Sequence, residues 1–206
     1  MGVYVTFHLG APDGLFAHFL CAPLGAYLAW LEASVEAFPE DFLPGAVDVL
    51  RDLVRRGRPA LEEAAARRPD VLDDLLTWYY PDFALREPAA RLESASPTML
   101  PDRFFETLES VLRARSSIDA ADLMAYLPTG RGIITGAPRH ARLTDQDPGR
   151  LSFWTLEEAR LLRTLLDGPS EAEHLTLDPD RAALPAVHEA VTLADERGTG
   201  LIIPVG

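Results

Sequence analysis

The sequence predicts an α+β fold that is mostly helical and contains a small sheet. Alternation of apolar and polar residues near the N-terminus and an apolar segment at the C-terminus predict strands, whereas apolar residues between them recur mainly at helical spacing. We expect the sheet to consist of the N-terminal strand, a strand near residues 131–136 and the C-terminal strand, covered by helices. The 206 residues fit a single domain, with residues 81–101 as the candidate for an internal hinge.

The N-terminal half begins with a strand and continues as helices. Val3, Val5, Phe7 and Leu9 alternate with more polar residues, which predicts a strand over residues 3–9. Glycines and prolines divide the segments that follow, because glycine ends helices readily and proline suits a first turn. The predicted helices cover residues 15–37 with a bend at Pro23, 46–56 ending at Gly57, a segment from Pro59 to before Pro69, and a segment from about Asp70 onward.

The C-terminal half follows a proline- and serine-rich loop at residues 81–101. Thr155 with Glu158 forms a capping-box pattern that predicts a helix start. The other predicted elements are helices over residues 102–114, 118–127 and 181–197, a short strand over 131–136, and a strand over 201–206. Pro204 cannot donate a ladder hydrogen bond, so we expect this last strand at the edge of the sheet.

Composition excludes several classes of function. All 19 basic residues are arginine, and without lysine the chain can form neither a Schiff base with pyridoxal phosphate nor a Walker-type phosphate loop. Without asparagine it has no Cys-His-Asn triad. The formal charge of −13 opposes binding to nucleic acid and to anionic lipid. We therefore expect no cofactor, no nucleic-acid partner and no membrane partner.

Cysteine usage and the N-terminus favour a cytoplasmic location. The single cysteine cannot form an internal disulfide. The N-terminus has no basic segment followed by an apolar run, so we expect no signal peptide, and no apolar stretch is long enough to span a membrane. The arginine-, alanine- and proline-rich usage, without lysine, suggests a bacterial origin.

His18 and the only cysteine, Cys21, are the first candidate site. They are neighbours on the predicted helix, on a side that also carries the small residues Ala22, Gly25 and Ala29. A helix that is apolar nearly all round is typically buried, so we favour a core-lining role in which this small-residue side packs closely against a neighbouring element. A reactive thiol beside the imidazole, or a metal site, is the alternative.

Two further segments carry candidate binding residues. The basic segment, residues 129–142, contains Arg131, Arg139, His140 and Arg142 with three glycines. Guanidinium groups and backbone N–H groups of a glycine-rich turn can hold a phosphate or carboxylate, although a solvated loop explains the same pattern. Three consecutive aromatic residues are either a stacking surface or the end of a helix that fills the core; these are Trp78, Tyr79 and Tyr80.

The chain resembles the YfbM-like family of small bacterial proteins at its two ends and at one internal helix. The resemblance lies in Met1-Gly2 leading into a strand, the L-x-x-x-T-x-E-E-A pattern at Leu151–Ala159, and a closing helix, Gly198 and apolar strand that ends at Val205-Gly206. It implies an arrangement of helices around a small sheet. It implies no activity and no catalytic residues.

These observations favour a non-catalytic cytoplasmic bacterial protein that acts through an acidic surface on a protein partner, which we expect to be basic. An immunity-type inhibitor or an adaptor fits this description. The alternative is a small hydrolase or transferase with a His/Cys pocket (His18, Cys21) or an Arg/His pocket around His140. A pocket in which two or more of these side chains converge would favour the enzyme.

Overall fold

The computed structural model describes residues 2–11, 19, 23–76, 98–101, 109, 112–113, 118–136, 150–167 and 183–205. The chain divides into two compact units. Unit 1 comprises Met1–Pro12, Leu92–Gly130 and His140–Gly206, and unit 2 comprises Asp13–Arg91 and Arg131–Arg139. One boundary between the units, after Arg91, falls inside the segment predicted as a hinge. The single domain with a hinge stays a prediction.

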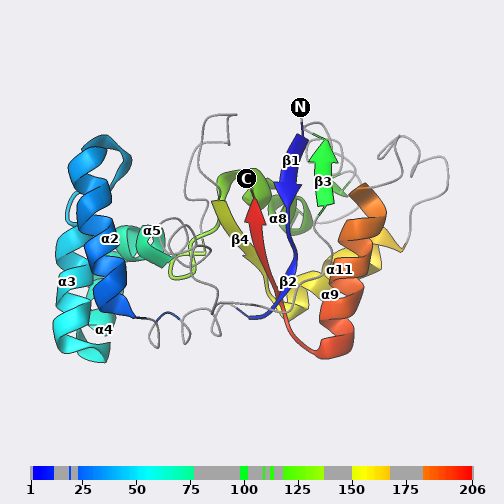
Figure 1. Cartoon of the computed structure of the whole chain (residues 1–206). Coiled ribbons are helices and arrows are strands. Elements are labelled where there is room, and N and C mark those ends of the chain that lie inside the picture. The colour runs from blue at the N-terminus through cyan, green and yellow to red at the C-terminus, as the bar shows by residue number, and fades with distance from the viewer. Residues whose placement is uncertain are drawn as a thin grey trace. The chain divides into compact units, whose positions relative to one another are not determined.

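Unit 1 contains an antiparallel sheet that joins the two ends of the chain (Figure 1). Its described strands are β1 (Gly2–Val5), β2 (His8–Leu9), β3 (Thr98–Pro101), β4 (Arg150–Trp154) and β5 (Leu201–Val205). The strand order is β2-β5-β1-β3, and β4 also pairs with β5. The N-terminal and C-terminal strands pair with each other, and the predicted α+β class with helices as the main element is confirmed.

The expected edge position of the C-terminal strand is wrong. Strand β5 lies inside the sheet, with β4 on one side and β1 and β2 on the other. Pro204 is tolerated because it lies opposite the break between β1 and β2, where its carbonyl oxygen accepts a hydrogen bond from Thr6 N–H (3.1 Å) and its missing N–H interrupts no regular ladder. The predicted N-terminal strand is thus present but divided into β1 and β2.

The predicted strand near residues 131–136 is also wrong. Arg131 makes only an isolated bridge, and residues 133–135 form a turn, which belongs to unit 2. Gly130 and Gly136 flank this segment with φ values of +69° and +67°, which bend the backbone out of the extended conformation. The sheet instead contains β3, in the segment expected to be a loop, and β4, for which no element was expected.

Three helices pack with this sheet in unit 1: α8 (Ile118–Thr129), α9 (Leu156–Leu166) and α11 (Ala183–Arg197). The predicted capping box is confirmed, because the Thr155 side chain accepts from Glu158 N–H and the Glu158 side chain accepts from Thr155 N–H. Trp154 is fully buried, and its indole N–H donates to the carbonyl of Leu123 in α8 (3.0 Å). The buried core that these elements share includes Val5, Phe7, Leu127, Leu162, Val187, Val191, Leu201, Ile203 and Val205.

Unit 2 is helical and follows the predicted boundaries closely. Its described helices are α2 (Leu24–Ala37), η1 (Pro39–Asp41), α3 (Ala46–Arg56), α4 (Arg58–Arg67) and α5 (Pro69–Asp74). Gly57 separates α3 from α4 with φ of +63°, and Pro23 precedes α2. Tyr27 of α2 is buried, and its hydroxyl donates to the Leu75 carbonyl just after α5 (2.8 Å), so the first and last of these helices are joined through the core.

Within the described residues, no helix is long and apolar enough to cross a membrane.

Candidate functional site

Most residues that the sequence predicts as functional lie outside the described part of the chain. These are His18, Cys21, Trp78, Tyr79, Tyr80, Arg139, His140 and Arg142. The thiol and aromatic hypotheses therefore stay predictions. Arg131 is described together with the turn that follows it, so the first part of the basic segment can be built from its contacts.

The turn after Arg131 is held by its own backbone. Gly136 N–H donates to the carbonyl of Gly132 (2.8 Å), and Arg131 Nε–H donates to the carbonyl of Gly136 (3.2 Å). Both contacts close the same short segment, and the second one uses a donor of the guanidinium that was a candidate for binding an anion. The turn therefore has a defined shape in which the N–H groups of residues 134 and 135 point to one place.

Those N–H groups bind a carboxylate of the chain itself. Asp73 of α5 is fully buried, and its Oδ1 accepts from Ile134 N–H (2.7 Å). Its Oδ2 accepts from Thr135 N–H (3.1 Å) and from the Thr135 hydroxyl (2.7 Å). In the structure the N–H groups of residues 134 and 135 are therefore occupied by Asp73, and the hypothesis that the basic segment binds a phosphate or carboxylate ligand stays a prediction.

Asp73 was missed by the sequence analysis, although its segment carries a signal. Asp73 and Asp74 stand between leucines in a short helical segment, and both are buried. Two adjacent aspartates on an apolar helix require buried hydrogen-bond partners, because burying an unpaired carboxylate is costly. The pattern indicates that a partner exists but not that it lies 61 and 62 residues further along the chain.

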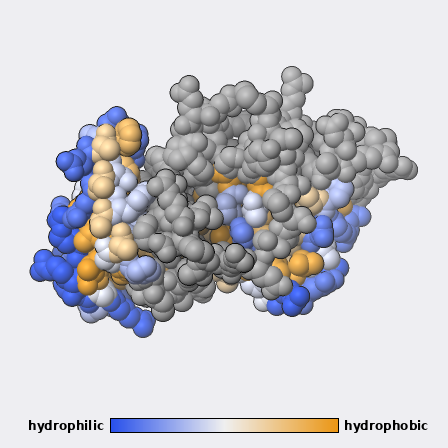
Figure 2. All heavy atoms as spheres, in the orientation of Figure 1, coloured by the Kyte–Doolittle hydropathy of each residue, from blue (hydrophilic) through white to orange (hydrophobic). Residues whose placement is uncertain are grey.

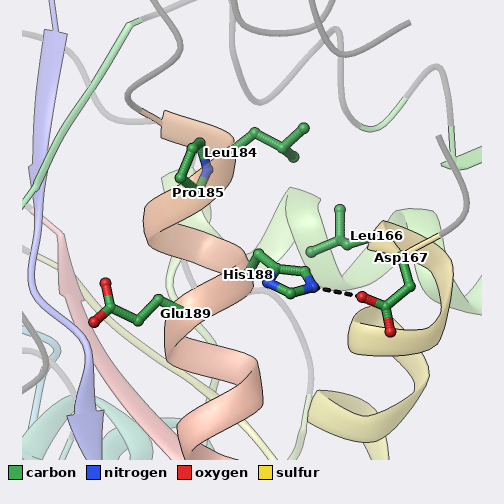
Figure 3. A pocket seen from close by; sticks show the side chains of 6 residues that line it. All are labelled: Leu166, Asp167, Leu184, Pro185, His188 and Glu189. Atoms are coloured by element: carbon green, nitrogen blue, oxygen red, sulfur yellow. Dashed lines mark hydrogen bonds and ion pairs between the residues drawn. The ribbon is translucent and has the colours of Figure 1, made fainter. Parts of the chain in front are cut away.

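A surface hollow in unit 1 is a second candidate site (Figure 3). It has a volume of about 380 Å³ and is lined by Leu166, Asp167, Leu184, Pro185, His188 and Glu189. Asp167 Oδ1 lies 2.6 Å from His188 Nε2, and both side chains are partly exposed. Since an ionised carboxylate only accepts, Nε2 carries the proton in this pair.

The polar groups around this hollow do not converge on one point. Figure 3 shows His188 pointing from α11 toward Asp167 at the end of α9, whereas Glu189 projects from the other side of α11. In the described residues, no group of three or more His, Cys, Asp or Glu side chains could hold a metal ion. The His188–Asp167 pair therefore resembles a structural contact between two helices more than a catalytic dyad.

A second set of polar contacts joins the same two helices. Asp195 of α11 accepts from Arg160 (2.6 Å) and from Arg163 (2.7 Å) of α9. The hydrogen bond from Arg160 is the largest cause that holds the pKa of the Asp195 carboxyl below its usual range; burial opposes it, and the hydrogen bond from Arg163 lowers the pKa further. These contacts and the His188–Asp167 pair stabilise the packing of α9 on α11.

The outward face of α2 is exposed, contrary to the expectation for the small-residue side of this helix. Gly25 and Ala29 were expected to pack closely against a neighbouring element, but both are exposed, and a methyl group added at Gly25 would meet no atom within 4 Å. Ala26, Ala33 and Ala37 are exposed as well. Figure 2 shows this face as a pale-orange column of apolar residues along α2, beside the hydrophilic surface of its neighbouring helices.

The charged residues around this face are mostly acidic. Glu32 is exposed and pairs with Arg51 of α3 (2.8 Å). Glu36 and Glu40 are exposed, and no ion pair joins either of them to another residue of the described part. Phe38 lies between them in the chain and is 59% exposed, the largest exposure of any large apolar residue described. We call the exposed residues of this region the α2 surface: Gly25, Ala26, Ala29, Glu32, Ala33, Glu36, Ala37, Phe38 and Glu40.

Comparisons with protein-family models, with curated proteins and with solved structures found no match to this chain. The resemblance to the YfbM-like family therefore stays a prediction. Any functional conclusion depends on the geometry of the chain itself.

Proposed function

We propose that this is a non-catalytic cytoplasmic bacterial protein that binds a basic protein partner through the α2 surface, as an immunity-type inhibitor or an adaptor does. The observation that carries the proposal is Phe38, a large exposed apolar side chain between two exposed carboxylates, Glu36 and Glu40. Aromatic side chains that become buried in an interface typically supply much of its binding energy.

The helical face beside Phe38 supports the same proposal. Most helices at a protein surface direct charged side chains to water, whereas α2 directs Gly25 and four alanines outward. Residues without long side chains let a partner backbone approach closely and lose little conformational entropy when they are covered. Phe38 and the exposed small residues of α2 supply apolar surface for a partner to cover, and the exposed carboxylates of Glu36 and Glu40 favour a partner of positive charge.

Charge complementarity identifies the class of partner. The net charge of −13 and the rim carboxylates attract a basic surface and repel acidic proteins and nucleic acid. A partner that presents arginine or lysine around an apolar cleft for Phe38 satisfies both features. The alternative, a small hydrolase or transferase, depends on His18, Cys21 and His140, and the described residues supply no observation in its favour.

The proposal is tested by charge reversal on the α2 surface. A basic partner, for example a toxin encoded beside this gene, is captured on the wild-type protein, on Glu36→Lys with Glu40→Lys, and on Phe38→Ala. Both variants should bind at least about tenfold more weakly, because one loses the rim charge and the other the apolar anchor. Glu157→Lys with Glu189→Lys is the matched control, since these exposed carboxylates lie in unit 1.

The ionic strength of the assay gives a second readout. Binding by the wild type should weaken between 50 and 200 mM salt, as expected from screening of exposed charges over about 10 Å. A partner that binds the Glu36/Glu40 variant and the wild type equally would place the interface elsewhere. Catalytic turnover that survives every change on the α2 surface would favour the enzyme.

A further inference from the structure

We propose that the turn at residues 132–135 is an anion-binding site that the native chain fills with its own Asp73, and that it binds a small carboxylate once that side chain is removed. The site lies within unit 2, and none of its residues belongs to the α2 surface. Its donors are Ile134 N–H, Thr135 N–H and the Thr135 hydroxyl.

The arrangement of donors selects an anion with two acceptor oxygens. Each oxygen of Asp73 accepts from a backbone N–H group, at 2.7 Å and 3.1 Å. An amide in the same place would direct its NH₂ group at one of these N–H groups, so Asn cannot reproduce both contacts. Backbone N–H groups that converge in a turn bind anions elsewhere in proteins, because their dipoles point at the bound charge.

The turn is also shaped to let an oxygen approach closely. A Cβ atom on Gly132 would lie nearest to Asp73 Oδ2 and only 2.5 Å from Thr135 Oγ1, so only glycine leaves space for the carboxylate here. The hydrogen bonds from Gly136 N–H to Gly132 O and from Arg131 Nε to Gly136 O do not involve Asp73. Two contacts that close the turn therefore remain when the Asp73 carboxylate is absent.

The size of the vacated space determines which ligand fits. Asp73→Ala removes one carboxylate group from a fully buried position, and formate has the same planar pair of oxygens with no additional carbon. Acetate adds a methyl group, and sulfate is larger and tetrahedral. In the wild type an external anion reaches these N–H groups only by displacing Asp73, so the contact acts as an internal competitor for the site.

The test is chemical rescue of Asp73→Ala. Thermal denaturation of the variant is measured in sodium formate, in sodium sulfate and in sodium chloride at equal ionic strength. Formate at 200 mM should raise the Tm of the variant by about 3 °C relative to chloride, and should not raise that of the wild type. Asp70→Ala is the matched control, since Asp70 is an exposed aspartate on the same helix. An equal response in Asp73→Ala and Asp70→Ala, or an equal effect of sulfate and formate, would overturn the proposal.

Hydrogen exchange of the wild type decides the question if Asp73→Ala does not fold. The amide protons of Ile134 and Thr135 lie in a turn, where exchange is usually fast, but both donate to a fully buried carboxylate. We expect them to exchange at least about 100-fold more slowly than in an unstructured chain. Fast exchange at both positions would show that the turn does not hold Asp73, and would also overturn the proposal.

Discussion

Gly132→Ala is the substitution that most directly tests the contact between Asp73 and the turn. No positive φ constrains Gly132, so the backbone tolerates alanine and the cost is steric alone. The new methyl carbon would lie 2.7 Å from Asp73 Cγ and closer still to Oδ2, which is nearer than real methyl carbons approach. Because Asp73 is fully buried, its carboxylate cannot swing into solvent without opening the core of unit 2.

The magnitude follows from the hydrogen bonds at risk. Three donors bind the Asp73 carboxylate, and each hydrogen bond to a charged group contributes about 1.5–3 kcal/mol. Relaxation of the turn preserves part of this hydrogen-bond contribution, so we expect Gly132→Ala to lower the free energy of unfolding by about 3 kcal/mol. Asp73→Asn should lower it by a similar amount, because one N–H group then faces an NH₂ group.

Urea denaturation, followed by far-UV circular dichroism, measures this loss. The matched control is Gly136→Ala, where φ is +67° and an added methyl group meets nothing within 4 Å. Backbone strain alone should cost that variant about 1 kcal/mol. A loss of less than about 0.5 kcal/mol for Gly132→Ala, or a loss no larger than that of Gly136→Ala, would refute the reasoning, because it would mean that Asp73 is not held against the turn.

Three further predictions concern other parts of the molecule. Gly25→Ala should raise the free energy of unfolding by about 0.5 kcal/mol in a urea titration, because the added methyl group meets no atom and the unfolded chain loses freedom. Ser152→Ala should be neutral or stabilising by up to about 1 kcal/mol in the same assay, since the buried Ser152 hydroxyl has no hydrogen-bond partner among the described residues; a clear loss would reveal one. The pKa of Asp195 is lowered in the folded state. The ionised Asp195 carboxylate therefore raises the free energy of unfolding above the unfolded pKa of about 4, and this contribution disappears as the pH falls through the lower folded pKa. The urea midpoints of the wild type and Asp195→Asn should therefore differ at pH 6 and converge toward pH 2.5, whereas a constant difference would contradict the assignment.

Local signals in the sequence were sufficient to predict most helices of this chain. Residues 46–56 were expected as a helix, and α3 occupies the same span, because Gly45 and Gly57 mark its two ends. The capping box at Thr155 and Glu158 located the start of α9 for the same reason. Caps and glycines act within one turn of the backbone, so neighbouring residues alone determine them.

The errors concern contacts between residues far apart in the sequence. The segment at 131–136 has the composition of a short strand, but Asp73, about 60 residues earlier, binds its N–H groups and favours a turn. Strand β3 lies in a proline- and serine-rich segment whose composition predicts a loop. Its extended conformation depends on its pairing with β1. Pro204 suggested an edge strand, although the break between β1 and β2 accommodates it inside the sheet.

Periodicity also did not reveal whether an apolar face is covered. The helix that contains Gly25 and Ala29 is apolar nearly all round, which normally indicates burial on every side. In unit 2 only the side that carries Tyr27 and Leu31 is buried. Which side is covered depends on where α3 and α5 lie, and that information is absent from the pattern of α2 alone.

Taken together, the contacts decide what kind of ligand the described residues can accept. Some of the donors that the sequence offered to an anion are already used in the described part of the chain, because Asp73 binds the N–H groups of Ile134 and Thr135 and Arg131 Nε binds the Gly136 carbonyl. Arg160 and Arg163 are likewise bound to Asp195. The carboxylates of Glu36 and Glu40, in contrast, lie exposed beside Phe38. A cationic partner therefore meets available acceptors and an apolar anchor on α2, whereas an anion that binds the turn after Arg131 must first displace the Asp73 carboxylate. This difference favours a basic protein over a phosphate-bearing ligand as the partner.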